Sequence, residues 1–245
     1  MSMIEVCQLE KSFGTNRVLD GVSFSIEPGE AVVILGRSGG GKSILLKHLI
    51  GLIQPDSGEV LVDGQNLAGL SERQLLPIRR KFGMLFQSAA LFDSLSVADN
   101  VNFMLRREKR LTTKEIERKV AETLEMVELS GVENKKPSEL SGGMRKRVGL
   151  ARAIIYEPQI ILYDEPTTGL DPVVADSIDR LIARVSAELK VTSIAVTHDM
   201  RSAQRISRRI LMLHEGRIYF SGPTGELFKS TDPILYRFVN GISTP

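Results

Sequence analysis

The sequence predicts an α/β fold, and three observations support this class. An apolar run at residues 31–35 leads through a glycine-rich loop into a helix-like segment at 44–50, the order expected of a buried strand followed by a helix. Short alternating or apolar stretches between turn signals predict antiparallel strands at residues 3–9, 18–26 and 59–63. From about residue 88 to 157 the pattern becomes helical. The chain therefore combines a strand-and-helix core with a mainly helical region.

The composition excludes several kinds of protein. The 32 basic and 30 acidic residues leave a net charge of +2, which is too balanced to indicate a nucleic-acid or membrane-surface binder. No apolar run approaches the length of about 18 residues that indicates a membrane span. The chain start lacks a basic segment followed by an apolar one, so we do not expect export.

Two further expectations concern single residue types. The only cysteine, Cys7, rules out an intrachain disulfide and is expected to be a buried, inert thiol in a strand. Local clusters of basic residues are expected to be solvated faces: Arg79–Lys81, Arg106–Arg107, Arg145–Arg147 and Arg208–Arg209.

The glycine-rich loop has the pattern Gly-x-x-x-x-Gly-Lys-Ser. It consists of Gly36, Arg37, Ser38, Gly39, Gly40, Gly41, Lys42 and Ser43. Glycines let the backbone wrap closely around a phosphate, and the following helix points its N-terminal N–H groups at the same anion. A flexible loop with a stray lysine is the alternative, but the strand before and the helix after favour a phosphate-binding loop. Lys42 is expected to reach the β- and γ-phosphates, and the Ser43 hydroxyl to bind Mg²⁺.

Two other strands end in a polar side chain. The apolar run at 82–87 ends in Gln87, and the β-rich run at 191–198 ends in His198. Ligands of open α/β sheets bind at the carboxyl ends of the strands. Gln87 is therefore expected either to bind Mg²⁺ or to orient the attacking water. His198 is expected to contact the γ-phosphate, although a lone histidine is more often structural.

Two adjacent carboxylates end the apolar strand at residues 160–165. Successive side chains of a strand point to opposite faces, so Asp164 and Glu165 are expected to have different roles. We assign Asp164 to the Mg²⁺ shell and Glu165 to activation of the nucleophilic water as general base. Salt-bridged surface acids are the alternative, which the phosphate-binding loop in the same chain disfavours.

The helical region contains two helix-start signals. Thr112 and Glu115 form a capping box. The helix behind it carries an apolar stripe that indicates core packing, formed by Ile116, Val120, Leu124 and Val127. Ser141 is a natural N-cap before Gly142 and Gly143. Each glycine weakens a helix by roughly 1 kcal/mol relative to Ala. Close approach to an anion is one reason for them, and an incidental turn is the alternative.

The sequence leaves the role of Phe13 and the docking of the last helix undecided. Phe13 lies in a turn of the small sheet, where its ring either stacks on a purine base or packs as an ordinary core or turn aromatic. The chain ends in a hairpin, 209–214 with 217–221, and a helix that begins at Asp232–Pro233 and stops at Gly241. This terminal helix docks either on its own chain or on a neighbouring one.

These motifs, in this order and approximate spacing, resemble the ATP-binding-cassette (ABC) ATPases over essentially the whole chain. They are the phosphate-binding loop, the Gln87 loop, the Leu140–Met144 signature, the Asp164–Glu165 strand, the Gly169–Asp171 loop and the switch residue His198. The resemblance implies one domain, 1–245, with a P-loop, RecA-like ATPase core and a small antiparallel β subdomain. The core would comprise 1–87 and 158–245, the helical signature subdomain 88–157, and the C-terminal tail 231–245.

The resemblance also implies a site for ATP and Mg²⁺ that two chains share. Family members act as head-to-tail homodimers, so Ser141, Gly142 and Gly143 of one chain would complete the γ-phosphate site on Lys42 and Ser43 of the other. Nucleotide contacts are also expected from Phe13, which matches the adenine-stacking position, and from Ile44 and Asp171. The implied catalytic residues are Glu165, His198, Gln87 and Lys42, and the implied metal ligands are Ser43, Gln87 and Asp164. Hydrolysis would then depend on closure of the dimer.

Within this family, the chain is similar to the Mla/Mce-associated ATPases, which energise lipid movement across bacterial envelopes. The similar features are Met144 in place of the usual signature Gln, the segment 86–97 and the ending 237–241. The loop Thr167–Asp171 departs from the Phe-Val-Gly-Gln-Asp of the enterobacterial relative. The resemblance implies a membrane permease, a Mce-type lipid-binding subunit, and a location on the cytoplasmic face of the inner membrane through the permease.

The sequence also disfavours other classes of ABC ATPase. Those that act on DNA or ribosomes carry long coiled coils or tandem cassettes, whereas about 50 residues separate Gln87 from the signature here. No nucleic-acid partner is therefore expected. A regulatory module without turnover would have a broken catalytic set, but Lys42, Asp164, Glu165 and His198 are all present. An ABC system for another solute stays open as the alternative.

Overall fold

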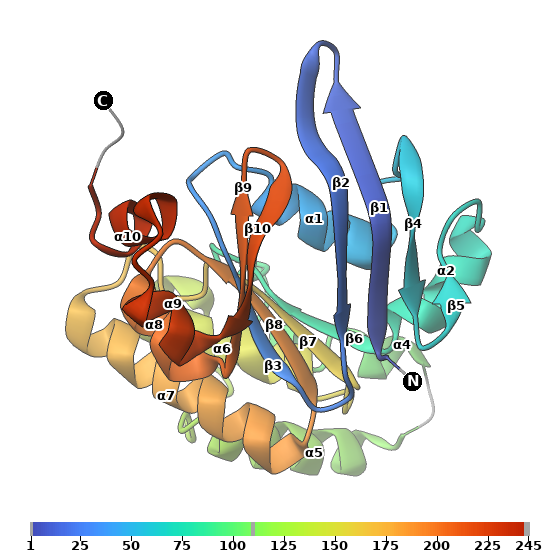
Figure 1. Cartoon of the computed structure of the whole chain (residues 1–245). Coiled ribbons are helices and arrows are strands. Elements are labelled where there is room, and N and C mark those ends of the chain that lie inside the picture. The colour runs from blue at the N-terminus through green and yellow to red at the C-terminus, as the bar shows by residue number, and fades with distance from the viewer. Residues whose placement is uncertain (1, 109–110, 243–245) are drawn as a thin grey trace.

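A six-stranded sheet lies at the centre of the computed structural model, which describes residues 2–108 and 111–242 (Figure 1). Its strand order is β10-β9-β3-β8-β7-β6, and only the pairing of β10 with β9 is antiparallel. The strands are β3 Ala31–Leu35, β6 Phe82–Leu85, β7 Ile160–Asp164, β8 Thr192–Thr197, β9 Arg209–His214 and β10 Arg217–Pro223. The predicted α/β class is confirmed, and the carboxyl ends of β3, β6, β7 and β8 meet at one edge of the sheet.

A smaller antiparallel sheet, ordered β2-β1-β4-β5, stands beside the central one (Figure 1). Its strands are β1 Ile4–Phe13, β2 Asn16–Ile26, β4 Ser57–Val62 and β5 Gln65–Asn66. The predicted strands at 3–9, 18–26 and 59–63 are confirmed, with shifted ends. β1 and β2 continue into a long hairpin that projects beyond the rest of the molecule.

The central sheet is buried on both faces because its strands send alternate side chains to two apolar clusters. Val32 and Ile34 pack with residues of α1 and the antiparallel sheet. Val33 and Leu35 pack in the cluster that includes helices of the opposite face. The stripe predicted from Ile116 to Val127 belongs to this second cluster and is confirmed as core.

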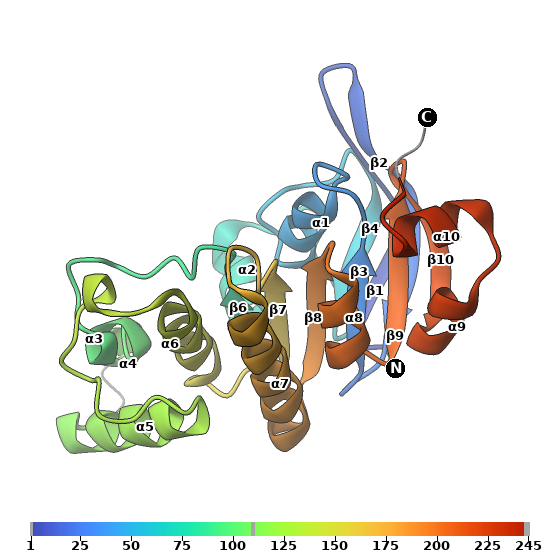
Figure 2. The same ribbon diagram turned by 90° about the vertical axis from the view of Figure 1, so that its left-hand side faces the viewer.

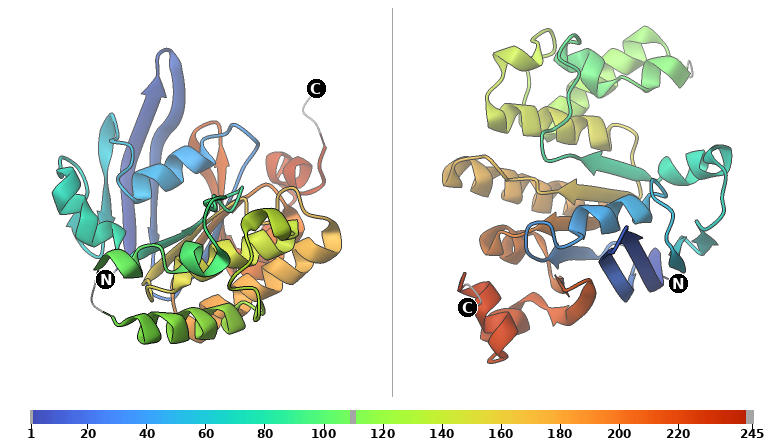
Figure 3. Two further views of the ribbon diagram at one scale, coloured as in Figure 1. Left: turned by 180° about the vertical axis from the view of Figure 1, so that it is seen from behind. Right: turned by 90° about the horizontal axis from the view of Figure 1, so that it is seen from above.

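Helices pack around the central sheet, and several of them form a group beyond one end of it. They are α1 Lys42–Leu49, α2 Glu72–Arg79, α3 Val97–Val101, α4 Leu105–Glu108, α5 Thr113–Met126, α6 Gly142–Ile154, α7 Pro172–Leu189, α8 Met200–Ile206, α9 Thr224–Lys229 and α10 Pro233–Val239, with a 3₁₀ turn at Pro137–Glu139. Figures 2 and 3 show α3, α4, α5 and α6 grouped at one end, opposite α9 and α10. Across residues 2–108 and 111–242, no helix is both long and apolar enough to cross a bilayer.

The predicted helix starts are confirmed by their caps. Thr112 Oγ1 accepts from the Glu115 N–H at 3.3 Å, and Glu115 Oε2 accepts from the Thr112 N–H at 2.6 Å, which is a capping box. Ser141 Oγ accepts from the Met144 N–H at 3.3 Å. Asp232 Oδ1 accepts from the first free N–H groups of α10 at 2.9 and 3.0 Å.

Several basic residues are less solvated than predicted. Lys146 is only 5% exposed. Arg79, Arg147 and Arg209 are half-buried because each guanidinium donates to backbone carbonyls of a neighbouring segment. The expectation of solvated faces is therefore wrong at these positions. Arg106 and Arg107, by contrast, are exposed as predicted.

Two smaller expectations also need correction. The strand predicted at 82–87 ends at Leu85, because its ladder with β7 ends at the Leu85–Tyr163 pair. Cys7 lies in β1 as predicted but is half-buried rather than buried. Desolvation and the Glu5 carboxylate raise the pKa of this thiol, which favours the unreactive protonated form.

Candidate active site

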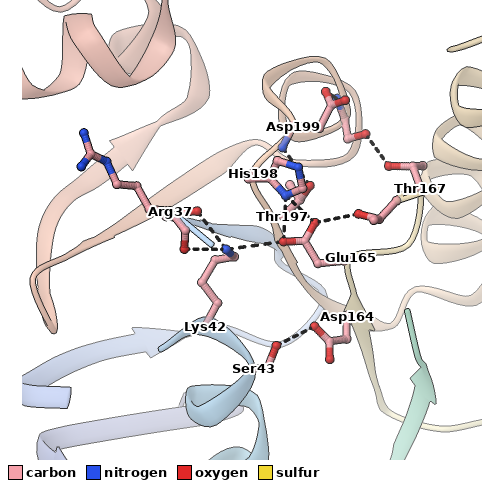
Figure 4. A network of polar contacts seen from close by, with 12 residues as sticks. Arg37, Lys42, Ser43, Asp164, Glu165, Thr167, Thr197, His198 and Asp199 are labelled. Atoms are coloured by element: carbon pink, nitrogen blue, oxygen red, sulfur yellow. Dashed lines mark hydrogen bonds and ion pairs between the residues drawn. The ribbon is translucent and has the colours of Figure 1, made fainter. Parts of the chain in front are cut away.

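The phosphate-binding loop runs from the end of β3 to the start of α1. Gly41 is the N-cap of α1 with φ +93°, a left-handed conformation that glycine tolerates. A Cβ there would lie 3.0 Å from a methyl group of Val18 in β2, so the loop packs closely against the antiparallel sheet. Lys42 is buried, and its Nζ donates to the carbonyls of Gly36 (2.8 Å) and Arg37 (3.1 Å) (Figure 4). The lysine is thus held inside the curve of the loop.

Ser43 and Asp164 meet at the carboxyl edge of the sheet. The Ser43 hydroxyl, in the first turn of α1, donates to Asp164 Oδ1 at 3.0 Å (Figure 4). Mg²⁺ is typically held by one or two carboxylates together with substrate phosphates. This hydroxyl and carboxylate fit such a partial shell. The described part of the chain has no cluster of three or more His, Cys, Asp or Glu side chains that could hold a metal alone.

Glu165 lies just beyond β7 at the centre of the polar network (Figure 4). Its φ of +47° is uncommon for a residue with a Cβ, and its N–H donates to the Val196 carbonyl at 3.0 Å. The residue is 9% exposed. Its carboxylate lies 3.4 Å from Lys42 Nζ and 3.0 Å from His198 Nδ1, and accepts from Thr168 Oγ1 at 3.2 Å. This turn therefore places the carboxylate between a lysine and a histidine.

His198 follows β8 at the same edge of the sheet. The next residue, Asp199, donates its N–H to Thr197 Oγ1 at 3.0 Å and caps the first free N–H groups of α8. These bonds fix the backbone on both sides of the histidine. The His198 side chain is 50% exposed, so the ring contacts Glu165 while it stays accessible to a ligand.

Gln87 is exposed beyond the end of β6, and its backbone is held by a lysine that sequence reasoning missed. Lys146 Nζ of α6 donates to the Gln87 carbonyl at 2.5 Å and lies 3.4 Å from the Glu165 carbonyl. Burial lowers the Lys146 pKa to about 8, although the two carboxylates at the end of β7 oppose this shift. The sequence held one sign that Lys146 is buried. It lies three residues after Gly143 and four before Leu150, and residues at these spacings share a helix face, which is the buried one here.

Phe13 lies at the end of β1 on the projecting hairpin. It is 48% exposed, so the core alternative is wrong. Lys11 Nζ lies 5.6 Å from the ring centroid. The hairpin's second strand contacts the phosphate-binding loop through Val18, which places an exposed aromatic on the strand pair beside that loop. Stacking on adenine stays a prediction.

The start of α6 packs against the start of α7 in the same chain. A Cβ on Gly143 would lie 2.6 Å from a methyl group of Val174. Close packing within the chain is therefore a further reason for glycine at this position. Ser141 is exposed. Asp171 accepts from two N–H groups of α7, both at 3.1 Å, and caps that helix. The nucleotide contacts of Ser141, Gly142 and Asp171 stay predictions.

A cavity of about 1030 Å³ beside His198 is lined mainly by α7, α8 and the loops before them. A buried network lies along it, in which Ser202 Oγ donates to Asp179 Oδ2 at 2.7 Å and lies 3.1 Å from Thr167 Oγ1. Asp179 is 3% exposed, and its Oδ1 has no hydrogen-bond partner within the described residues. Burial raises the Asp179 pKa to about 6. The sequence pattern gave no sign of this buried acid.

Comparison with known proteins agrees with this arrangement. A family model described as ABC transporter matches residues 19–168. The chain is 45% identical to the chloroplastic protein TRIGALACTOSYLDIACYLGLYCEROL 3 of Arabidopsis thaliana, over 98% of this chain and 74% of the relative. It is 44% identical to the probable ribonucleotide transport ATP-binding protein mkl of Mycobacterium leprae (97% and 69%). It is 39% identical to the intermembrane phospholipid transport system ATP-binding protein MlaF of Haemophilus influenzae (99% and 92%).

Solved structures give the same result. A dimeric ATP-binding cassette in a post-hydrolysis state, bound to ADP and Pi, matches with a TM-score of 0.82 and 34% identity, over 91% of this chain and 99% of that one. The phosphate-binding loop, the polar strand ends and the family match lead to one conclusion. The chain belongs to the ABC transporter family and is an ATP-binding, ATP-hydrolysing cassette.

Proposed function

We propose that this chain is the ATPase subunit of a lipid transporter and that it hydrolyses ATP at the carboxyl edge of its central sheet. The observation that carries the proposed site is the position of the Glu165 carboxylate, 3.4 Å from Lys42 Nζ and 3.0 Å from His198 Nδ1. The hydrogen-bonded Ser43 and Asp164 are the sequence neighbours of Lys42 in α1 and of Glu165 at the end of β7. These contacts support our assignment of a base, a phosphate-binding cation and metal ligands to one site.

The proposed reaction uses each of these groups. Lys42 and the N–H groups of the phosphate-binding loop bind the β- and γ-phosphates and stabilise the charge that develops on them. Glu165 accepts a proton from the attacking water, while His198 holds that carboxylate and contacts the γ-phosphate. Gln87 orients the water or joins the metal shell. Mg²⁺ on Ser43 and Asp164 would neutralise phosphate charge.

The proposed active unit is a head-to-tail dimer of this chain. Ser141 caps α6 in the helical group, whereas Lys42 begins α1 on the central core, and the two helices lie apart in Figure 2 and in the right-hand view of Figure 3. We therefore assign Ser141, Gly142 and Gly143 to the γ-phosphate site of a second copy. The dimeric state of the solved relative supports this arrangement.

The proposed cargo is a phospholipid or another lipid of a bacterial envelope. One relative named above is the ATP-binding protein of an intermembrane phospholipid transport system, and another carries the name of a galactolipid. In this proposal the cassette sits on the cytoplasmic face of the inner membrane, attached to a permease that works with a Mce-type lipid-binding subunit. Another solute is the second candidate, because one relative is named for ribonucleotide transport.

Co-purification from native membranes tests the cargo class. A tagged chain is solubilised with its partners, and the partners are identified by mass spectrometry together with any bound lipid. The proposal predicts a multi-pass permease, a Mce-type subunit and phospholipid. A permease with a small-solute receptor would replace the lipid assignment, and recovery without any permease would contradict the transporter role.

A further inference from the structure

Two cationic side chains of α6 hold the loop that follows β6. Lys146 Nζ donates to the Gln87 carbonyl at 2.5 Å, and Arg152 donates to the carbonyls of Ala89 and Ala90, both at 2.7 Å. Ala89 and Ala90 have φ of +60° and +47°, which is uncommon for residues with a Cβ. Such a backbone persists only where the surroundings fix it. The loop therefore depends on α6 for its shape.

Lys146 differs from Arg152 because it also reaches the turn after β7. Its Nζ lies 3.4 Å from the Glu165 carbonyl, which also accepts from the Thr168 N–H at 3.3 Å. Lys146 is 5% exposed, so water has little access to replace these bonds. One buried ammonium group thus contacts both the Gln87 loop and the backbone of the residue assigned as general base.

We propose that Lys146 is a positioning residue that couples the signature helix to the catalytic turn. Displacement of the Ser141 end of α6 would move the Gln87 loop and the Glu165 turn together, because Lys146 binds both carbonyls. A shift of α6 on docking against the partner's nucleotide would then reach the general base through Lys146. This inference deepens the ATPase function proposed above and rests on it.

The surroundings allow a conservative replacement. A small cavity of about 140 Å³ borders Lys146, Gln87, Gly142 and Thr168 and offers room for a larger head group. Lys146→Arg keeps a cation with several N–H donors that can reach two carbonyls. Lys146→Met has a similar length but no donor, so it removes the link and retains most of the packing.

Steady-state ATP turnover is the first test. Lys146→Met is expected to lower kcat by about tenfold to a hundredfold, because small displacements of catalytic groups have effects of this size. Its KM for ATP should stay within about threefold, and Lys146→Arg should keep kcat within about threefold. Lys119→Met is the matched control, since it makes the same change at the half-buried Lys119 of α5, which pairs with the exposed Glu157 away from the site. Turnover of Lys146→Met within twofold of the parent, or equal losses for Met and Arg, would overturn the proposal.

Hydrogen exchange tests the link without relying on hydrolysis. Lys146→Met should accelerate exchange at the amides of residues 88–90 and at Thr168 by about tenfold. Arg152→Met should accelerate only the loop at 88–90, and β9 should be unchanged in both variants. Acceleration confined to the loop in Lys146→Met, or a uniform rise throughout the chain, would overturn the link. A parent protein without ATPase activity would refute the proposed function instead and would leave this exchange test intact.

Discussion

Glu165 is the residue on which the proposed chemistry most directly depends. Its carboxylate is buried between Lys42 and His198, and its backbone conformation is uncommon for a residue with a Cβ. Glu165→Gln keeps the shape and can still accept from Thr168, but it cannot take a proton from water.

Glu165→Gln is therefore expected to retain ATP binding and to slow hydrolysis by about 10²-fold or more, the size expected for loss of a general base. Phosphate release and nucleotide binding would be measured on the same preparation. Turnover equal to that of the parent would remove Glu165 from this role.

Asp179 provides a prediction about stability and pH. Its pKa is raised by burial to about 6, above the unfolded value of about 3.9, so the folded state binds more protons between these values. Stability therefore falls as pH rises through this window. Asp179→Asn removes this pH-dependent loss of stability. The increase in the free energy of unfolding that the substitution causes should be about 1 kcal/mol larger at pH 7.5 than at pH 5.

Urea unfolding of both proteins at the two pH values measures this difference. Asp176→Asn, three residues earlier on α7, is the control. The Arg180 guanidinium holds the Asp176 pKa below its usual value, so this change should give no gain. An Asp179→Asn gain that is independent of pH would show that the carboxyl is charged in the folded state near pH 5.

Among single residues, the sequence predicted the polar groups at strand ends and in the phosphate-binding loop, and it missed Lys146 and Asp179, which are buried in α6 and α7. Ser43, Asp164, Glu165 and His198 lie together because parallel strands bring their carboxyl ends to one edge. Lys146 was predicted to be solvated. A basic side chain is buried only when hydrogen-bond acceptors satisfy it, and the acceptors of Lys146 are carbonyls from distant segments of the chain. Those carbonyls, on the loop after β6 and the turn after β7, are visible only in the folded chain.

Among the helices, those whose start was recognised in the sequence were predicted, and three short ones were not. α5, α6 and α10 begin at the predicted caps Thr112, Ser141 and Asp232. The short helices α2, α8 and α9 have six to eight residues and were absent from the sequence prediction. Isolated helices of this length are marginal, so packing against the sheet decides whether they form.

The capping box of α5 gives a prediction at this scale. Thr112→Ala removes the acceptor for the Glu115 N–H and should lower the free energy of unfolding by about 1 kcal/mol. Thr113→Ala is the matched control, because its side chain is exposed and lies inside the helix start. Urea unfolding of both variants measures the difference, and equal effects would show that the cap does not stabilise the helix.

At the scale of the whole molecule, the sequence pattern predicted strands and helices but not the strand order. The last parallel strand, β9, pairs with β3 although more than 170 residues separate them. β10 then closes the sheet as the antiparallel edge. The order of the strands depends on how the whole core packs, and local sequence carries little information about it.

The proposed dimer holds ATP between the Lys42 loop of one copy and the Ser141 cap of the other. Light scattering of Glu165→Gln in the presence of ATP and Mg²⁺ measures whether this dimer forms. We expect twice the 27.1 kDa mass of one chain with nucleotide, and a single-chain mass after Ser141→Arg is added, with ATP binding retained. A single-chain mass at saturating ATP, or a dimer unaffected by Ser141→Arg, would contradict it.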